Sequence, residues 1–184
     1  MSASNYFRES INNKSSNSFR VVSFNIAHGR AKSLHQILTS KKQINQNCRE
    51  IGNFLVNTNA DIVLLQEIDF RSFWSNHLHQ SKIINHAQEF PYFCDGNHNI
   101  SNQYVSLEYG NALLSKHQII DNLHFSFEKK YLGGKGYQKA CIQLQNRSIT
   151  VFNLHLHPIS NKIKAKQLQI LGEVIENTPK PFLI

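Results

Sequence analysis

The chain has 184 residues, and its 20 Lys and Arg against 12 Asp and Glu give a formal net charge of +8. This length suits one domain, and a hydrophobic content of 40% excludes a disordered or collagen-like chain. Cys48, Cys94 and Cys141 are odd in number and far apart, which argues against a disulfide framework or a cysteine zinc site.

The sequence contains neither a long apolar run nor the apolar region of a secretory signal. We therefore expect a cytoplasmic monomer without a transmembrane segment, and secretion by a route that ignores N-terminal signals stays open. The basic balance invites a phosphate-bearing partner, but the densest clusters are only Lys41-Lys42 and Lys129-Lys130. Charge alone favours an ordinary solvated surface over a nucleic-acid site.

The first half of the chain predicts a tail followed by a strand, a helix and a strand. Residues 1–18 are polar without a sustained period and predict a disordered tail, with the domain over 19–184. Residues 20–26 predict a strand, and residues 61–67 predict a strand that is covered on both faces and ends in the carboxylate of Glu67. Between them, apolar residues at helical spacing predict a helix: Ile44, Cys48, Ile51 and Leu55.

The second half continues the alternation of helices and strands. We expect a helix over residues 72–90, and a loop over 91–102 because Asp95-Gly96-Asn97 is a turn signal. Further strands are expected at 109–115, 139–144, 148–156 and 182–184, and a helix with the apolar stripe Leu168, Leu171 and Ile175. Gly133-Gly134-Lys135-Gly136 lacks the spacing of a phosphate-binding loop and predicts a flexible connection. This order indicates a single α/β domain.

Polar residues lie where these strands end. Asn25 and Glu67 follow the first two strands, and Asn153, His155 and His157 share one face of a later strand. Because sites in α/β folds collect at the carboxyl ends of strands, these groups could converge on one rim. Each also has an ordinary structural reading, as a surface carboxylate or a buried polar group.

The residue types at this rim favour oxygen chemistry over zinc. A glutamate with an asparagine suits Mg²⁺ or Mn²⁺, and a nearby histidine can contact a phosphoryl oxygen. His155 and His157 share a face as two zinc ligands would, but no third ligand is evident at close spacing. The pattern is typical of phosphoester cleavage. The aromatic group after Glu67, which consists of Phe70, Phe73 and Trp74, fits the core better than a cleft.

Four segments, in this order and spacing, resemble the endonuclease/exonuclease/phosphatase superfamily, whose members are DNase I-like. They are Val22-Ser23-Phe24-Asn25-Ile26, residues 61–67, Tyr109-Gly110-Asn111-Ala112-Leu113-Leu114-Ser115-Lys116 and Val151-Phe152-Asn153-Leu154-His155-Leu156. The resemblance covers nearly all of residues 19–184 and implies a four-layered α/β/β/α sandwich.

The resemblance also implies roles for particular residues. Glu67 matches the glutamate that binds the catalytic divalent ion, Mg²⁺ or Mn²⁺, and Asn25 matches the asparagine that supports this ion. His155 matches the catalytic histidine that contacts the scissile phosphate. The remaining matches, Asn111, Lys139 and Asn153, are expected near the substrate.

The sequence departs from the family pattern at its C-terminal end. Neither the Gly-Asp-x-Asn motif nor the later Asp-His pair follows Pro181-Phe182-Leu183-Ile184. We therefore expect an N-terminal portion of a metal-dependent phosphodiesterase, nuclease or phosphatase, with weakened activity by itself. The alternatives are a catalytically dead relative that binds nucleic acid or a phosphorylated partner, and a truncated product that does not fold stably.

Overall fold

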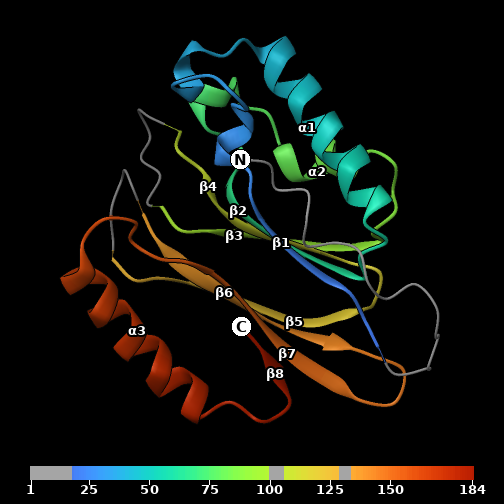
Figure 1. Cartoon of the computed structure of the whole chain (residues 1–184), viewed down its shortest axis with the longest axis vertical. Coiled ribbons are helices and arrows are strands. Elements are labelled where there is room, and N and C mark those ends of the chain that lie inside the picture. The colour runs from blue at the N-terminus through green and yellow to red at the C-terminus, as the bar shows by residue number, and fades with distance from the viewer. Residues whose placement is uncertain (1–17, 100–105, 129–133) are drawn as a thin grey trace, which may run out of the picture.

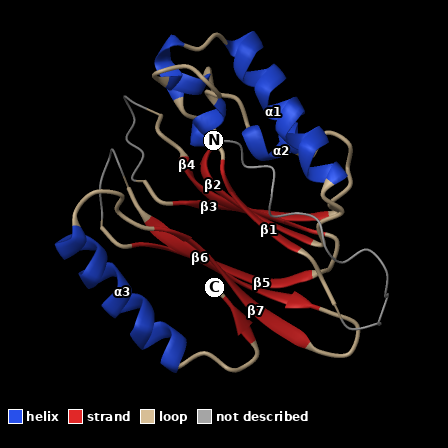
Figure 2. Cartoon of the chain, viewed as in Figure 1, coloured by secondary structure: helices blue, strands red, loops and turns tan. Residues whose placement is uncertain are grey.

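The computed structural model describes residues 18–99, 106–128 and 134–184, so the expected tail lies almost entirely outside the described residues. Two four-stranded sheets stack face to face, as Figure 1 shows. Two helices, α1 and α2, cover the outer face of one sheet, and α3 covers the outer face of the other (Figure 2). This arrangement is the expected four-layered α/β/β/α sandwich.

The first sheet has the strand order β1-β2-β4-β3 and the second has β5-β6-β7-β8. Their strands are β1 (Val21–Asn25), β2 (Ile62–Asp69), β3 (Tyr92–Asn97), β4 (Tyr109–Ser115), β5 (Ile119–Ser126), β6 (Gly136–Gln143), β7 (Ser148–His155) and β8 (Phe182–Leu183). The helices are α1 (Lys41–Asn57), α2 (Gln80–Ile84) and α3 (Asn161–Glu176), with short 3₁₀ turns η1 (Ala27–Gly29), η2 (Gln36–Leu38) and η3 (Phe73–Ser75).

Two strand pairs are parallel, and each is joined by a long helix. The pair β1 and β2 is connected through α1, and the pair β7 and β8 through α3. Because a helix that crosses between parallel strands runs back along them, α1 and α3 both begin near the carboxyl ends of β1 and β7. In Figure 1 both helices start on the upper left side of the sandwich and run toward the lower right.

The predicted helix over the first apolar stripe is confirmed as α1. Ser40 is its N-cap, and the Ser40 hydroxyl accepts a hydrogen bond from the amide of Gln43. Ile44, Cys48 and Leu55 are fully buried against the outer face of the first sheet. Burial of this stripe holds α1 on the sheet, since most of the stability of helices in proteins comes from the packing of an apolar face.

The apolar stripe of α3 differs in part from the prediction. Leu171 is buried against Tyr137 and Phe152 of the second sheet, but Leu168 is 49% exposed. Gln167 is buried in this region, where its Oε1 accepts a hydrogen bond from the amide of His157 at 2.8 Å. A polar contact to the loop before α3 therefore replaces one of the expected apolar contacts.

Two further expectations are wrong. The segment 72–90 is mostly turns, with helical structure only in η3 and α2, and residues 92–97 form β3 instead of a loop. Gly96 misled the turn interpretation because it lies in a strand opposite Asn111, beside Gly110. The strand β5 was not expected at all.

Among the described residues, no helix combines the length and apolar character needed to cross a membrane.

Candidate active site

The carboxyl ends of β1, β2 and β7 meet at one rim of the sandwich. Asn25, the last residue of β1, pairs with Gln66 of β2. Gln66 crosses to the other sheet, where its Nε2 donates a hydrogen bond to Oδ1 of Asn153 on β7 at 2.7 Å. The expected convergence of these strand ends is therefore present, and it joins the two sheets.

A β-bulge in β2 places Glu67 at this rim. Gln66 pairs with Asn111 and Ile68 with Gly110, so Glu67 is an extra residue without a partner on β4. Its φ of +52° is rare for a residue other than glycine. Alternation would otherwise point Glu67 into the core beneath α1, where Leu65 and Ile68 lie. The strand also continues beyond Glu67 to Asp69, contrary to the expectation that Glu67 ends it.

Glu67 forms a cluster with His155 and Lys135, which is hereafter called the rim cluster. Oε1 of Glu67 lies 3.2 Å from Nε2 of His155 and 3.7 Å from Nζ of Lys135. Nζ of Lys135 lies 2.8 Å from the same nitrogen of His155. The Glu67 side chain is 24% exposed, so the carboxylate can be reached from solvent.

The electrostatics of the rim cluster keep the carboxylate ionised. The hydrogen bond from His155, with the nearby charges of His28, His155 and Lys135, lowers the pKa of Glu67 to about 2 although burial opposes this shift. Burial lowers the pKa of Lys135, and the neighbouring Glu67 partly offsets this effect. At neutral pH the site therefore presents a carboxylate beside nitrogen donors.

A second polar pair, not anticipated from the sequence, supports the rim from behind. Nδ1 of His28 lies 3.2 Å from Oδ1 of Asp69, which is fully buried. The indole of Trp74 donates a hydrogen bond to the same oxygen at 3.0 Å, and the rings of Trp74 and Tyr109 pack against His28. The pair joins residues 41 positions apart, so no local sequence pattern indicates it.

Asn111 and Asn153 lie beneath the rim and not on its surface. Both are buried, and Nδ2 of Asn111 donates to the carbonyl of Asn153 at 2.7 Å. Nδ2 of Asn153 donates to the carbonyls of Leu65 and Ala112, each at 3.0 Å. These amides fix the two sheets against each other directly under Glu67.

Of the other residues expected at the site, one lies away from the rim, and two accept hydrogen bonds from backbone amides. Nζ of Lys139 lies 5.8 Å from the ring centroid of Phe152, on the side of β6 that faces α3 and away from the rim.

Oδ1 of Asn25 accepts a hydrogen bond from the amide of Ala27 at 2.9 Å. Nδ1 of His157 accepts hydrogen bonds from the amides of Ile159 and Ser160, which fixes the loop before α3. The structure thus brings Glu67 and His155 together, and places Lys139 apart from them.

The aromatic group after Glu67 divides between core and surface. Phe70 and Trp74 are buried, as expected, and Phe73 is 46% exposed.

The donor set of the rim suits a hard cation such as Mg²⁺. Within residues 18–99, 106–128 and 134–184, no three His, Cys, Asp or Glu side chains come together as a metal cage. Magnesium does not require such a cage, because it is commonly held by one or two carboxylates and keeps several waters. The ionised and accessible Glu67 carboxylate fits this requirement, and zinc, which takes four ligands, does not fit.

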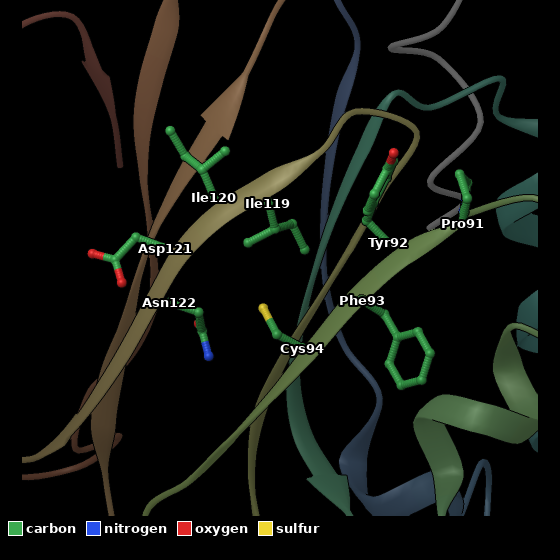
Figure 3. Close-up of a pocket in the computed structure, with 8 residues that line it drawn as sticks. All are labelled: Pro91, Tyr92, Phe93, Cys94, Ile119, Ile120, Asp121 and Asn122. Carbon is green, nitrogen blue, oxygen red and sulfur yellow. The ribbon is translucent and has the colours of Figure 1, made fainter.

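A cavity at the opposite end of the sandwich is separate from the rim cluster. It has a volume of about 480 Å³ and lies between the edge strands β3 and β5 (Figure 3). Tyr92 of β3 pairs with Ser115, which also pairs with Ile62 at the start of β2. Burial raises the pKa of the Cys94 thiol in this cavity to about 12, so this cysteine is not a nucleophile at neutral pH.

Solved structures of low sequence identity share this fold. A beta toxin double mutant from Staphylococcus aureus with bound magnesium ions has a TM-score of 0.59 at 16% identity, over 89% of this chain and 60% of that chain. TDP2 from D. rerio, complexed with a single strand DNA product, has a TM-score of 0.61 at 15% identity, over 88% and 56%. Sphingomyelinase C from Streptomyces griseocarneus has a TM-score of 0.61 at 14% identity, over 89% and 61%.

This chain spans 56% to 63% of the length of similar beta toxin and TDP2 structures. No curated protein matches it. The model of the Endonuclease/Exonuclease/phosphatase family matches residues 22–184, which include the rim cluster and both sheets apart from Val21. The chain therefore belongs to the Endonuclease/Exonuclease/phosphatase family.

Proposed function

We propose that this protein is a divalent-metal-dependent phosphoester hydrolase that directs a water molecule onto phosphorus at the rim cluster. The observation that carries the proposal is the position of Glu67. A β-bulge turns this carboxylate out of the core and sets it 3.2 Å from Nε2 of His155, which comes from the other sheet. A bulge that re-aims one charged side chain in this way is typical of active sites.

Glu67 would hold Mg²⁺ or Mn²⁺, with Asn25 beside it at the end of β1. The bound ion would polarise the phosphoryl group and lower the pKa of a bound water. The low pKa of Glu67 supports this role, because the carboxylate is free of its proton throughout the neutral range. The magnesium ions of the similar beta toxin structure support the choice of cation.

The other members of the rim cluster would contact the phosphate. His155 and Lys135 place two nitrogen donors beside Glu67, where they can stabilise the charge that develops on phosphoryl oxygens. Asn111 and Asn153 would act by holding the strands beneath the cluster, since both are buried. Lys139 has no part in this proposal because it lies on the α3 side of β6.

The test is hydrolysis of bis-p-nitrophenyl phosphate by the purified 184-residue chain with Mg²⁺ or Mn²⁺. We expect turnover that EDTA abolishes and that Glu67→Gln lowers by about a hundredfold or more, as loss of a main electrostatic contact does. Glu173→Gln is the matched control, since Glu173 is an exposed glutamate near the far end of α3.

Equal rates for the wild type and Glu67→Gln would refute the assignment of Glu67. If a folded wild-type chain shows no turnover but binds a phosphorylated ligand, the binding-only alternative replaces the proposed hydrolase.

A further inference from the structure

Two loops that follow the strand ends of the rim carry aliphatic side chains that are exposed. In the loop between η1 and α1, Leu34 is 92% exposed, Ile37 57% and Leu38 75%. In the loop between β7 and α3, Ile159 is 85% exposed. Single exposed apolar residues are common on protein surfaces, but three within five residues are an unusual concentration. These two loops are hereafter called the rim loops.

The rim loops follow β1 and β7, which belong to the two different sheets. The first follows η1, where His28 contacts Asp69 behind the rim cluster. The second begins directly after His155. Because both loops leave the carboxyl ends of strands that meet at the rim, each sheet contributes one loop with exposed aliphatic side chains at this end of the sandwich.

Hydrogen bonds to the backbone hold both loops in shape. Nη1 of Arg30 donates to the carbonyls of Ser33 at 2.6 Å and Leu34 at 3.4 Å. In the second loop, Nδ1 of His157 accepts from the amides of Ile159 at 3.3 Å and Ser160 at 3.0 Å. The aliphatic side chains therefore project from formed loops.

The chain segments that carry the rim loops contain basic residues and no acidic ones, while the rim itself holds Glu67 and Asp69. The sequence has no Asp or Glu between Glu9 and Glu50, and none between Glu128 and Glu173. The first turns of α1 and α3 contain no acidic residue and instead carry Lys41, Lys42, Lys162 and Lys164. Cations in a first turn oppose the helix dipole, so these lysines do not serve helix stability.

We propose that the rim loops are a docking surface for an anionic lipid bilayer. Aliphatic side chains beside lysines match the boundary between acyl chains and negatively charged headgroups. Single-stranded nucleic acid would instead favour aromatic side chains for base stacking, and the exposed apolar residues within these loops are Leu and Ile, with the half-exposed Phe73 in the neighbouring η3. Docking on both loops turns the rim cluster toward the headgroups. Phosphoesters at a membrane surface are then its substrates, a step that rests on the proposed function.

The experiment is co-sedimentation of the chain with phosphatidylcholine vesicles, with and without phosphatidylserine, in EDTA so that hydrolysis plays no part. We expect binding only to vesicles with phosphatidylserine, and weaker binding as salt rises. The variant Leu34→Ser/Ile37→Ser/Leu38→Ser should bind at least about tenfold more weakly. Ile159→Ser should also bind more weakly, since it changes the other rim loop.

The controls separate docking from folding and from catalysis. Ile120→Ser removes an aliphatic side chain of similar exposure from β5, outside the rim loops, and should bind like the wild type. Lys41→Gln/Lys42→Gln tests the charge alone if the triple serine variant fails to fold. Glu67→Gln should dock normally, so a failure of the hydrolase proposal leaves this measurement intact.

Three results would overturn the docking surface. The first is that the wild-type chain does not bind anionic vesicles. The second is that the rim-loop variants bind these vesicles as strongly as the wild type. The third is that single-stranded DNA binds the wild type and displaces it from the vesicles.

Discussion

Glu67 occupies a backbone conformation that costs free energy and that few residues other than glycine adopt. The neighbours in β2 continue an ordinary ladder on either side, so the cost is confined to the residue whose carboxylate reaches the rim. His155 and Lys135 offset this cost through the charges that they place beside the carboxylate.

This electrostatic support predicts a specific pH dependence of stability. The pKa of Glu67 falls from an ordinary 4.5 to about 2 in the folded chain, so the folded state binds fewer protons than the unfolded state between these values. The stabilisation is complete above about pH 5 and disappears as the pH falls toward 2, with a limit of about 3 kcal/mol.

Urea unfolding in EDTA measures this contribution. The difference in unfolding free energy between the wild type and Glu67→Gln should shrink as the pH falls from about 5 to about 3. A difference that stays constant across this range would contradict the assigned shift.

The residues of the site differ in how far sequence could identify them. Glu67 and His155 stand in motifs at the ends of apolar strands, which made them visible. Lys135 belongs to a glycine-rich segment that predicted only a flexible connection, and its contact with Glu67 exists only when the two sheets stack. His28 and Asp69 are also far apart in the sequence, 41 positions, and come into contact only in the folded chain. Asn153 shares the face of His155, yet only packing shows that it is buried under the rim.

At the scale of elements, the strands and helices with strong periodicity were predictable. The buried strand β2 and the helix α1 carry continuous or regularly spaced apolar residues, and both were expected. The edge strands β3 and β5 are partly exposed and carry polar residues, so their sequences lack an apolar pattern. The short α2 is held by its contacts with α1, which no local pattern encodes.

The close pairing of β3 with β4 predicts that one added methyl group at Gly110 strongly lowers the stability of the fold. A Cβ on Gly110 would lie 2.0 Å from the carbonyl oxygen of Gly96 and 3.1 Å from Cδ2 of His98, which is buried. Gly110→Ala should therefore lower the free energy of unfolding by about 2–3 kcal/mol or more, because the backbone of one strand must move.

Gly172→Ala in α3 is the matched control. A Cβ at Gly172 meets nothing within 4 Å, so this variant should stabilise the chain by about 0.5–1 kcal/mol through helix propensity. Chemical denaturation of both variants checks the pair of predictions, and a neutral Gly110→Ala would show that the two strands are farther apart in solution.

At the scale of the whole molecule, hydrogen bonds of buried side-chain amides fix the two sheets relative to each other. The amide of Asn153 contacts the carbonyls of Leu65 and Ala112 and the side chain of Gln66, all in the opposite sheet. Apolar residues such as Leu64 and Val151 also pack between the sheets. Because the hydrophobic effect has no preferred direction, this packing specifies the relative position of the sheets less than the hydrogen bonds do.

Asn153→Ala should lower the unfolding free energy by about 2–4 kcal/mol, because it leaves several buried polar groups without partners. Asn146→Ala, in the exposed turn between β6 and β7, should change it by no more than about 0.5 kcal/mol. Thermal unfolding of both variants is the measurement. Equal midpoints would show that other contacts hold the sheets in register.

The hydrogen bond between Gln66 and Asn153 fixes the relative position of the two sheets, and this position sets the distance between the site residues that the sheets carry. Glu67 follows Gln66 directly, and His155 lies two residues beyond Asn153, so this buried bond is close in sequence to both partners of the contact between Glu67 and His155. Any sliding of one sheet over the other changes the gap between carboxylate and imidazole before it exposes the core. We therefore expect that a looser contact between the sheets slows the proposed hydrolysis before it unfolds the chain.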